Sequence, residues 1–191
     1  MIKPHGSEIL NPLYVQDEQE RNRFLAEALD LPSILISSAA AANAVMLGSG
    51  YFTPLPGYMN KRDALQVAKD MHTSNGLFWP VPILNVVQDV SSIRGATRIA
   101  LRDPNVEGNP VLAIQDIEAV EEFSDADMQY MTEKVFRTLD EKHPGVAAFN
   151  SVGRFCISGP IQVLNYSYFE TEFPETFRTA YQIRNAMKAL G

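Results

Sequence analysis

Residues 50–60 read Gly-Tyr-Phe-Thr-Pro-Leu-Pro-Gly-Tyr-Met-Asn, and this stretch sets the organisation of the chain around it. Two glycines and two prolines within it exclude a regular helix or strand. The large apolar residues between them nevertheless require burial, which predicts a loop packed into the core. Asn60 has the side chain of a helix N-cap, so we expect a helix over residues 61–71.

The segments around this loop alternate between helical and strand-like patterns, which indicates an α+β fold. Before the loop, the apolar spacing predicts helices over residues 17–29 and 39–47, with a short strand over 33–37. After it, β-prone runs separated by turn residues predict strands over residues 81–87, 98–101, 111–117, 152–157 and 161–166. Ser124 predicts a capped helix over 125–137, and His143-Pro144-Gly145 predicts a turn.

The last residues differ from this β-rich middle because they form one long amphipathic pattern. Residues 173–190 predict a helix with Pro174 in its first turn. One side of that helix carries an apolar stripe made of Phe177, Tyr181, Met187 and Leu190. Such a stripe needs a partner, so the helix either folds back on the chain or packs against a partner outside it.

Composition places the chain among globular proteins and disfavours several other classes. It has 191 residues, 46% hydrophobic and 20% charged, which suits one domain with at most a fragment of another. A net charge of −7 argues against nucleic-acid binding and against adhesion to anionic membranes. One cysteine, Cys156, allows no internal disulfide, and neither a signal peptide nor a membrane-spanning stretch is visible. These features predict a cytoplasmic protein.

Residue spacing predicts no catalytic, cofactor-binding or metal-binding residue. The histidines lack metal-ligand spacing; they are His5, His72 and His143. Gly48-Ser49-Gly50 does not match a nucleophile motif, and Gly153-Arg154 does not form a phosphate-binding loop. Solvation of a surface helix and its entrance explains the grouped acids better than acid–base chemistry; these are Glu118, Glu121, Glu122, Asp125 and Asp127.

Five ordered motifs resemble the ATP sulfurylase (sulfate adenylyltransferase) family, in the branch found in sulfur-metabolising bacteria. The first is the loop at residues 50–60. The next two are Leu-Phe-Trp-Pro-Val-Pro-Ile at 77–83 and Ile-Ala-Leu-Arg-Asp at 99–103. Then come Lys-Val-Phe-Arg-Thr-Leu-Asp at 134–140, which His-Pro-Gly-Val follows at 143–146, and Ser-Gly-Pro-Ile at 158–161.

The resemblance implies that residues 1–167 form the family's N-terminal, non-catalytic domain, which has a PUA-like, β-barrel-containing fold. Residues 168–191 would then begin the catalytic nucleotidyltransferase domain. The full family enzyme uses ATP and Mg²⁺ to convert sulfate into adenylylsulfate and pyrophosphate, in sulfate assimilation or, in reverse, in sulfur oxidation. The expected partners are therefore the catalytic domain and further copies of the chain, with no nucleic acid and no membrane.

Residues 182–185, Gln-Ile-Arg-Asn, resemble the start of the family's catalytic motif, Q-x-R-N-P-x-H-x-x-H, but the proline and histidines do not follow. They also fall in the middle of the predicted helix, whereas the family motif follows a strand. The family's later G-R-D loop is missing too, because Gly153-Arg154 is followed by Phe155. We therefore expect the chain to be inactive alone. Two alternatives stay open: a free-standing PUA-like module that binds RNA, and a small enzyme with an unrecognised site.

Overall fold

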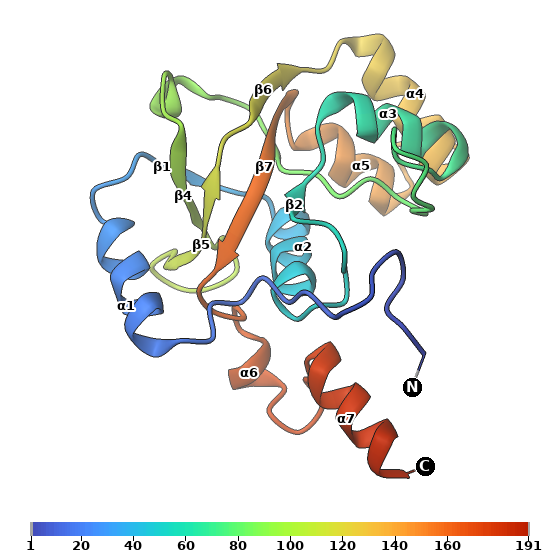
Figure 1. The fold of residues 1–191 in the computed structure, drawn as a ribbon. Coiled ribbons are helices and arrows are strands. Elements are labelled where there is room, and N and C mark those ends of the chain that lie inside the picture. Colours follow the sequence, from blue (N-terminus) through green and yellow to red (C-terminus); the bar gives the residue numbers. More distant parts are fainter. Residues whose placement is uncertain (1, 191) are drawn as a thin grey trace.

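The computed structural model describes residues 2–190 and contains a curled, mixed sheet with helices around it (Figure 1). The strand order is β1-β4-β5-β7-β2, and β3 and β6 also pair with β7. The β1–β4 pair is parallel and the other pairs are antiparallel. The strands are β1 (Ser33–Leu35), β2 (Gly57–Tyr58), β3 (Val86–Val87), β4 (Arg98–Arg102), β5 (Val111–Asp116), β6 (Ala119–Glu122) and β7 (Phe155–Val163).

Strand β7 organises the sheet because it changes partners along its length. Residues 155–158 pair with β6, whereas residues 161–163 pair with β5. The change falls at Gly159, whose φ of +134° favours glycine, and a Cβ there would clash with the main-chain oxygen of Asp116. The prediction of two strands separated by a turn at 158–160 is therefore wrong: the Ser-Gly-Pro triplet bends one continuous strand.

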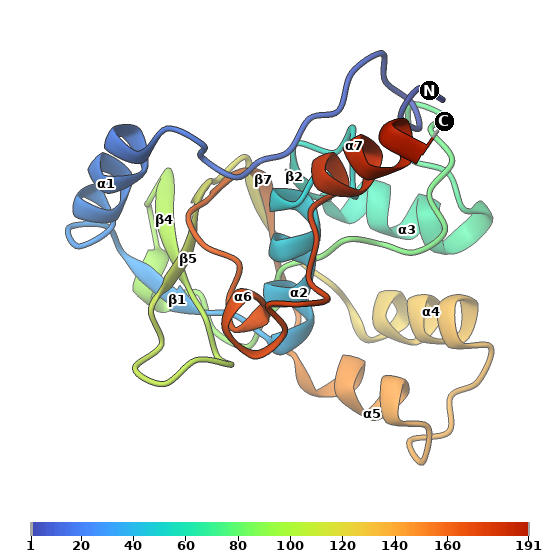
Figure 2. The same ribbon diagram turned by 90° about the horizontal axis from the view of Figure 1, so that it is seen from below.

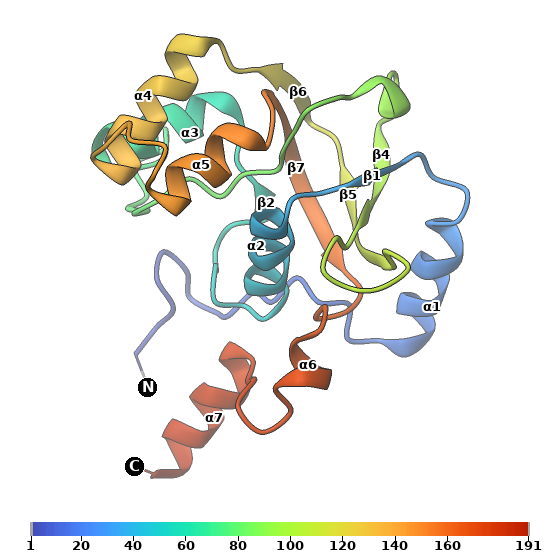
Figure 3. The same ribbon diagram turned by 180° about the vertical axis from the view of Figure 1, so that it is seen from behind.

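Helices cover the sheet and extend beyond one end of it (Figures 2 and 3). Helix α2 packs against β7, and α3, α4 and α5 form a group in which α4 contacts both of the others. Helix α1 lies at the far side of the sheet from that group (Figure 1). The helices are α1 (Glu18–Glu27), α2 (Ser38–Gly48), α3 (Lys61–Asp70), α4 (Asp125–Phe136), α5 (Pro144–Ser151), α6 (Phe169–Glu172) and α7 (Ala180–Leu190), with a 3-10 turn, η1 (Ser91–Ile93).

Local capping confirms the predicted starts of two helices. The main-chain N–H of Asp63 donates to Asn60 Oδ1 over 2.8 Å, which starts α3 as the sequence predicts. Ser124 and Asp127 form a reciprocal capping box at the start of α4. Lys61 Nζ lies 2.7 Å from Asp127 Oδ2, so this ion pair links the starts of α3 and α4.

The loop at residues 50–60 packs into the core, as predicted, but the expectation that it contains no strand is wrong, because Gly57–Tyr58 form β2 and pair with β7. Leu55, Tyr58 and Met59 are all buried. The Tyr58 hydroxyl donates to the main-chain oxygen of Ala40 over 2.8 Å and so joins the loop to α2. The main-chain N–H of Ile161 donates to Pro56 O over 3.1 Å, which joins the loop to β7.

Three further expectations about secondary structure are wrong. Only Val86–Val87 of the predicted strand at 81–87 pairs in the sheet. Residues 143–145 do not form a simple turn, because His143 Nδ1 accepts from the N–H of Gly145 and Pro144 begins α5. The predicted helix over 173–190 is broken: α6 ends at Glu172, α7 begins at Ala180, and Pro174 lies in the irregular segment between them.

Candidate interaction surface

Helix α7 carries large apolar side chains that the rest of the described chain leaves exposed. Tyr181, Met187 and Leu190 are 62%, 63% and 89% exposed. We call these three residues, together with the half-covered Ile183, the α7 surface. Helix α7 lies apart from the sheet and from the α3–α5 group, close to the N-terminal segment (Figures 1 and 2). The predicted exposure is confirmed for the three members on α7, but they do not form one stripe, because Tyr181 and Leu190 lie on opposite sides of the helix.

Phe177, the fourth member of the predicted stripe, has a different position. It lies in the segment between α6 and α7, with its ring centroid 5.3 Å from that of Tyr166 and 5.7 Å from that of Phe169. Its side chain therefore anchors the segment to the body of the protein. A stripe read as one continuous helix could not place Phe177 there.

Few contacts hold α7 to the body. Ala180 is buried at its start, and its main-chain N–H donates to Ser49 O over 2.9 Å. The Tyr51 hydroxyl donates to Arg178 O over 2.8 Å. The Arg184 guanidinium donates to Ile2 O and so ties α7 to the N-terminal segment.

Gln182 and Arg184, two of the three residues that match the start of a catalytic motif, both have structural contacts here. Gln182 lies in the first turn of α7, not mid-helix as expected. Its Oε1 accepts from the N–H of Thr179 over 2.8 Å, and its own N–H donates to Thr179 Oγ1 over 3.3 Å. This is a reciprocal capping box, the arrangement that starts a helix.

A groove of about 790 Å³ separates the α6–α7 segment from the body. One wall is the N-terminal segment, the floor includes Ser49 and Tyr166, and the other wall comes from α6, the segment before α7 and the first turn of α7. The residues that line it are Leu10, Pro12, Tyr14, Gln16, Ser49, Tyr166, Glu170, Pro174, Phe177, Arg178, Thr179, Tyr181 and Gln182.

The polar groups of the groove are mostly uncharged. The rings of Tyr14 and Tyr166 stack with centroids 4.5 Å apart. Burial is the main cause that raises the pKa of the Tyr166 hydroxyl, so this group stays protonated. Ser49 is fully buried, and its Oγ has no hydrogen-bond partner within residues 2–190.

Charge in the groove is balanced. Among the lining residues that the structure describes, the one carboxylate is Glu170 and the one guanidinium is Arg178. Arg178 Nη1 already donates to Pro174 O over 3.1 Å and to Phe177 O over 2.6 Å. These two bonds hold the Arg178 side chain against the segment before α7.

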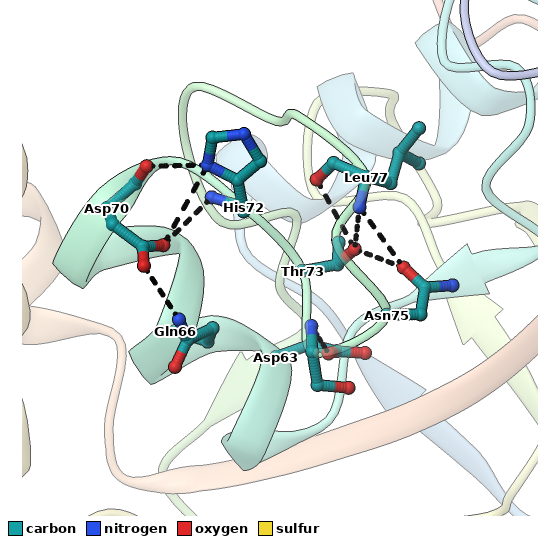
Figure 4. A network of polar contacts seen from close by, with 8 residues as sticks. Asp63, Gln66, Asp70, His72, Thr73, Asn75 and Leu77 are labelled. Carbon is teal, nitrogen blue, oxygen red and sulfur yellow. Dashed lines mark hydrogen bonds and ion pairs between the residues drawn. The ribbon is translucent and has the colours of Figure 1, made fainter.

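The three histidines have structural contacts, and His5 and His72 both lie against Phe78. His5 Nε2 is 2.8 Å from Phe78 O, and His143 caps α5. His72 follows α3 in the network of Figure 4, where its main-chain N–H donates to Asp70 Oδ1 over 3.2 Å. In the same network Gln66 Nε2 donates to Asp70 Oδ2 over 2.8 Å, which closes the end of α3. Within residues 2–190, no three His, Cys, Asp or Glu residues are placed to hold a metal ion.

The grouped acids do not all lie on a surface helix and its entrance, which corrects that expectation. Glu121 and Glu122 belong to strand β6 and pair with Cys156 and Phe155 of β7. Glu121 Oε2 accepts from the N–H of Lys61 over 2.8 Å and so stabilises the start of α3. The predicted helix does contain Asp125 and Asp127 in its first turn.

Arg154 forms an ion pair with Asp125 and does not face a phosphate-binding loop. Gly153 beside it has a φ of +108°, and a Cβ there would clash with the main-chain carbonyl of Val87. This glycine is required by the close approach of two main chains. It is therefore a structural residue of the junction between β3 and β7.

The groove is the feature that sequence reasoning missed. Ser49 was noticed only as part of a failed nucleophile motif, and neither Tyr14 nor Tyr166 was singled out. These residues meet because the N-terminal segment runs beside β7, where Tyr14 bridges to Val163. No periodicity or motif in the sequence signals such a contact.

Comparison with known proteins identifies the fold family. The family model described as a PUA-like domain matches residues 2–166. The chain belongs to the PUA-like domain family. The model's last matched residue comes after β7 and before α6, so the α6–α7 segment lies outside it. None of the helices in residues 2–190 is both long and apolar enough to span a bilayer.

Several curated relatives share the name sulfate adenylyltransferase. The protein from Alcanivorax borkumensis is 62% identical over 185 residues, which cover 97% of this chain and 46% of the relative. The protein from Allochromatium vinosum is 59% identical and covers the whole chain but 48% of the relative. The relative from the Riftia pachyptila sulfur-oxidizing endosymbiont is 53% identical, with 43% of its length covered. The chain thus spans about half the length of these relatives.

A solved structure shows the same fold in a more distant protein. The hexameric APS kinase from Thiobacillus denitrificans matches with a TM-score of 0.70 at 22% identity. The match covers 98% of this chain and 31% of that protein. At this identity the likeness concerns the fold alone.

Proposed function

We propose that this chain is the N-terminal, non-catalytic domain of a sulfate adenylyltransferase with the first helices of its catalytic domain, and that the rest of the catalytic domain packs on the α7 surface. The observation that carries the proposal is the set of relatives of that name that are 53% to 62% identical to the chain and about twice its length. Residues 1–167 form the PUA-like domain in this proposal, and residues 168–191 begin the nucleotidyltransferase domain. The exposed side chains of Tyr181, Met187 and Leu190 are then covered by the rest of the nucleotidyltransferase domain, to which α7 belongs.

The catalytic half supplies the chemistry. Adenylyl transfer from ATP to sulfate develops negative charge on several oxygens, which the site must meet with cations and fixed N–H donors. The groove beside α7 holds balanced charge and does not meet this need. ATP, Mg²⁺ and sulfate therefore bind outside residues 1–191, and the PUA-like domain positions the catalytic half and supports assembly into a cytoplasmic homo-oligomer.

An ATP-forming assay tests this proposal. The chain is incubated with adenylylsulfate, pyrophosphate and Mg²⁺, and ATP is read by luminescence. A second protein joins residues 1–191 to the part of the Alcanivorax borkumensis enzyme that the chain does not match. We expect no rate above the blank for the chain alone and a clear rate for the joined protein. A clear rate from the chain alone would overturn the proposal, and so would a well-folded but inactive joined protein.

A further inference from the structure

We propose that Asn75 is a site of spontaneous deamidation, and that the hydroxyl of Thr73 restrains this reaction in the folded chain. Asn75 is the one asparagine of the sequence that glycine follows, and both residues belong to the turn after α3. The inference concerns a covalent change within the chain itself, so it does not rest on the proposed function.

The reaction needs only the chain and water. The main-chain nitrogen of Gly76 loses its proton and attacks Cγ of Asn75. The new N–Cγ bond closes a succinimide ring, while the Cγ–Nδ2 bond breaks and the side-chain amide leaves as ammonia. Water then opens the ring at either carbonyl and gives aspartate or isoaspartate. Nothing is oxidised or reduced, and the isoaspartate product has a main chain longer by one methylene.

The turn leaves the reacting groups open to solvent. The N–H of Thr73 donates to Leu77 O over 2.9 Å, which closes a hairpin over residues 73–77. Asn75 and Gly76 at its tip are exposed. Gly76 has a φ of +85°, and a Cβ there would meet nothing within 4 Å. No neighbouring group therefore shields the attacking nitrogen.

Hydrogen bonds at the tip restrain both partners of the reaction. Asn75 Oδ1 accepts from Thr73 Oγ1 over 2.5 Å and from the N–H of Leu77 over 3.3 Å (Figure 4). The N–H of Gly76 donates to Thr73 O over 2.9 Å, which keeps the proton on the attacking nitrogen. Attack requires this nitrogen to lose its acceptor and the amide to turn toward it. The rate in the folded chain therefore follows local opening of the tip.

Thr73 is the residue that holds both reacting groups. Its side chain is buried, and its Oγ1 also accepts from the N–H of Leu77 over 3.1 Å. The hydroxyl is thus fixed on the hairpin while it donates to Asn75. Thr73→Val removes this donor but keeps the shape of the side chain and the main-chain oxygen that binds Gly76.

Deamidation at the tip would reach the N-terminal segment through the hairpin. His5 Nε2 lies 2.8 Å from Phe78 O. Gly6 lies against the Leu77 side chain, because a Cβ at Gly6 would come within 2.6 Å of Leu77 Cδ1. An isoaspartate lengthens the main chain just before these two contacts. We therefore expect residues 5–6 to loosen in the isoaspartate form.

Timed peptide mapping of the isolated chain tests the proposal. The chain is kept at pH 8, and mass spectrometry follows the loss of ammonia and separates aspartate from isoaspartate. Asn105 is the internal control, because it is also exposed and its Oδ1 also accepts from a hydroxyl, that of Ser38, over 2.7 Å. Val106 follows it, and a branched side chain crowds the attacking nitrogen. The variants are Thr73→Val and Thr73→Ser, which keeps the hydroxyl.

We expect Asn75 to react at least about tenfold faster than Asn105 in the folded chain, because glycine leaves its nitrogen open. Thr73→Val should accelerate the reaction of Asn75 by about fivefold, which converts to about 1 kcal/mol for the lost bond, and Thr73→Ser should return it to the wild-type rate. In guanidinium chloride the wild type and Thr73→Val should react equally, and both should react faster than the folded wild type.

Two results would overturn the proposal in separate parts. If Asn75 reacts no faster than Asn105, Asn75 is not the deamidation site. If Thr73→Val leaves the folded rate unchanged or lowers it, Thr73 does not restrain the reaction. Comparison of folded with unfolded wild type needs no variant: an equal or faster rate in the folded chain would also contradict the restraint.

Discussion

Leu190 offers a direct measure of what the α7 surface contributes to docking. Its side chain is 89% exposed in the chain alone. Full burial of a leucine is worth about 1.5–3 kcal/mol, so covering the exposed part stabilises the docked state by about 1.3–2.7 kcal/mol. Leu190→Ser removes most of this stabilisation of the docked state. In the isolated chain the same change should alter the free energy of unfolding by less than about 0.5 kcal/mol, because the side chain already faces solvent.

The assay is the alkylation rate of Met187→Cys in the joined protein, where reaction requires α7 to leave its partner. When α7 closes faster than the reagent reacts, the alkylation rate is proportional to the equilibrium constant for opening. Loss of about 1.3–2.7 kcal/mol of docking free energy therefore predicts that Met187→Cys reacts about tenfold to about ninetyfold faster. Leu29→Ser is the matched control, since Leu29 is a 77% exposed leucine beyond α1 and outside the α7 surface. A change of less than about twofold for Leu190→Ser, or equal acceleration by both variants, would refute the reasoning.

Three further predictions concern the body of the domain. Gly153→Ala should lower the free energy of unfolding by more than about 3 kcal/mol, whereas Gly108→Ala, at a φ of +77° with open space around it, should cost about 1–2 kcal/mol; urea unfolding compares the two. The Lys61 contact is the largest cause that lowers the pKa of Asp127, to about 2. The stabilisation that the Asp127 carboxylate provides is therefore complete above pH 4 and is lost as the pH falls toward 2. The difference in free energy of unfolding between wild type and Asp127→Asn should accordingly narrow over that range. Finally, Cys156 should resist a thiol reagent at pH 8 in the folded chain and react once urea unfolds it; reaction at a similar rate in both states would contradict its buried position.

The parts of the fold that follow local rules could be predicted from the sequence. Asn60 and Ser124 cap helices because their side chains reach the free N–H groups of the next turn, which depends on no distant residue. The burial of the loop at 50–60 follows from its apolar residues, but its prolines and glycines do not reveal that Gly57–Tyr58 pair with β7 as β2.

Tertiary pairing overrode local preference in the β-rich half. Ser158-Gly159-Pro160 has the chemistry of a turn, yet β6 on one side and β5 on the other extend the strand through it. The acidic segment at residues 119–122 disfavours a strand by composition, yet it pairs in register with β7 over four residues. Sequence periodicity cannot show which neighbour a strand will have.

Helix α5 was missed although Pro144 at its first position is a recognised start signal. Its stability depends on packing that local sequence does not show. Val146 is fully buried, and Phe149 lies against Phe136 with centroids 6.2 Å apart. A helix of this length is marginal alone, so only the partner α4 explains it.

Helix α7 depends both on local capping and on tertiary contacts, and it is the element on which the proposed function rests. Its eleven residues fall below the length at which an isolated helix is stable in water, about 12–15 residues. Within the described chain it is supported by the Thr179–Gln182 capping box, by buried Ala180 and by the bond from Arg184 to Ile2. These contacts fix where α7 starts and how it is oriented, but they leave its apolar side chains in water, which costs free energy that only a partner recovers. In the proposed function the PUA-like body acts as a base that presents α7, and the contacts of Gln182 and Arg184 serve that presentation.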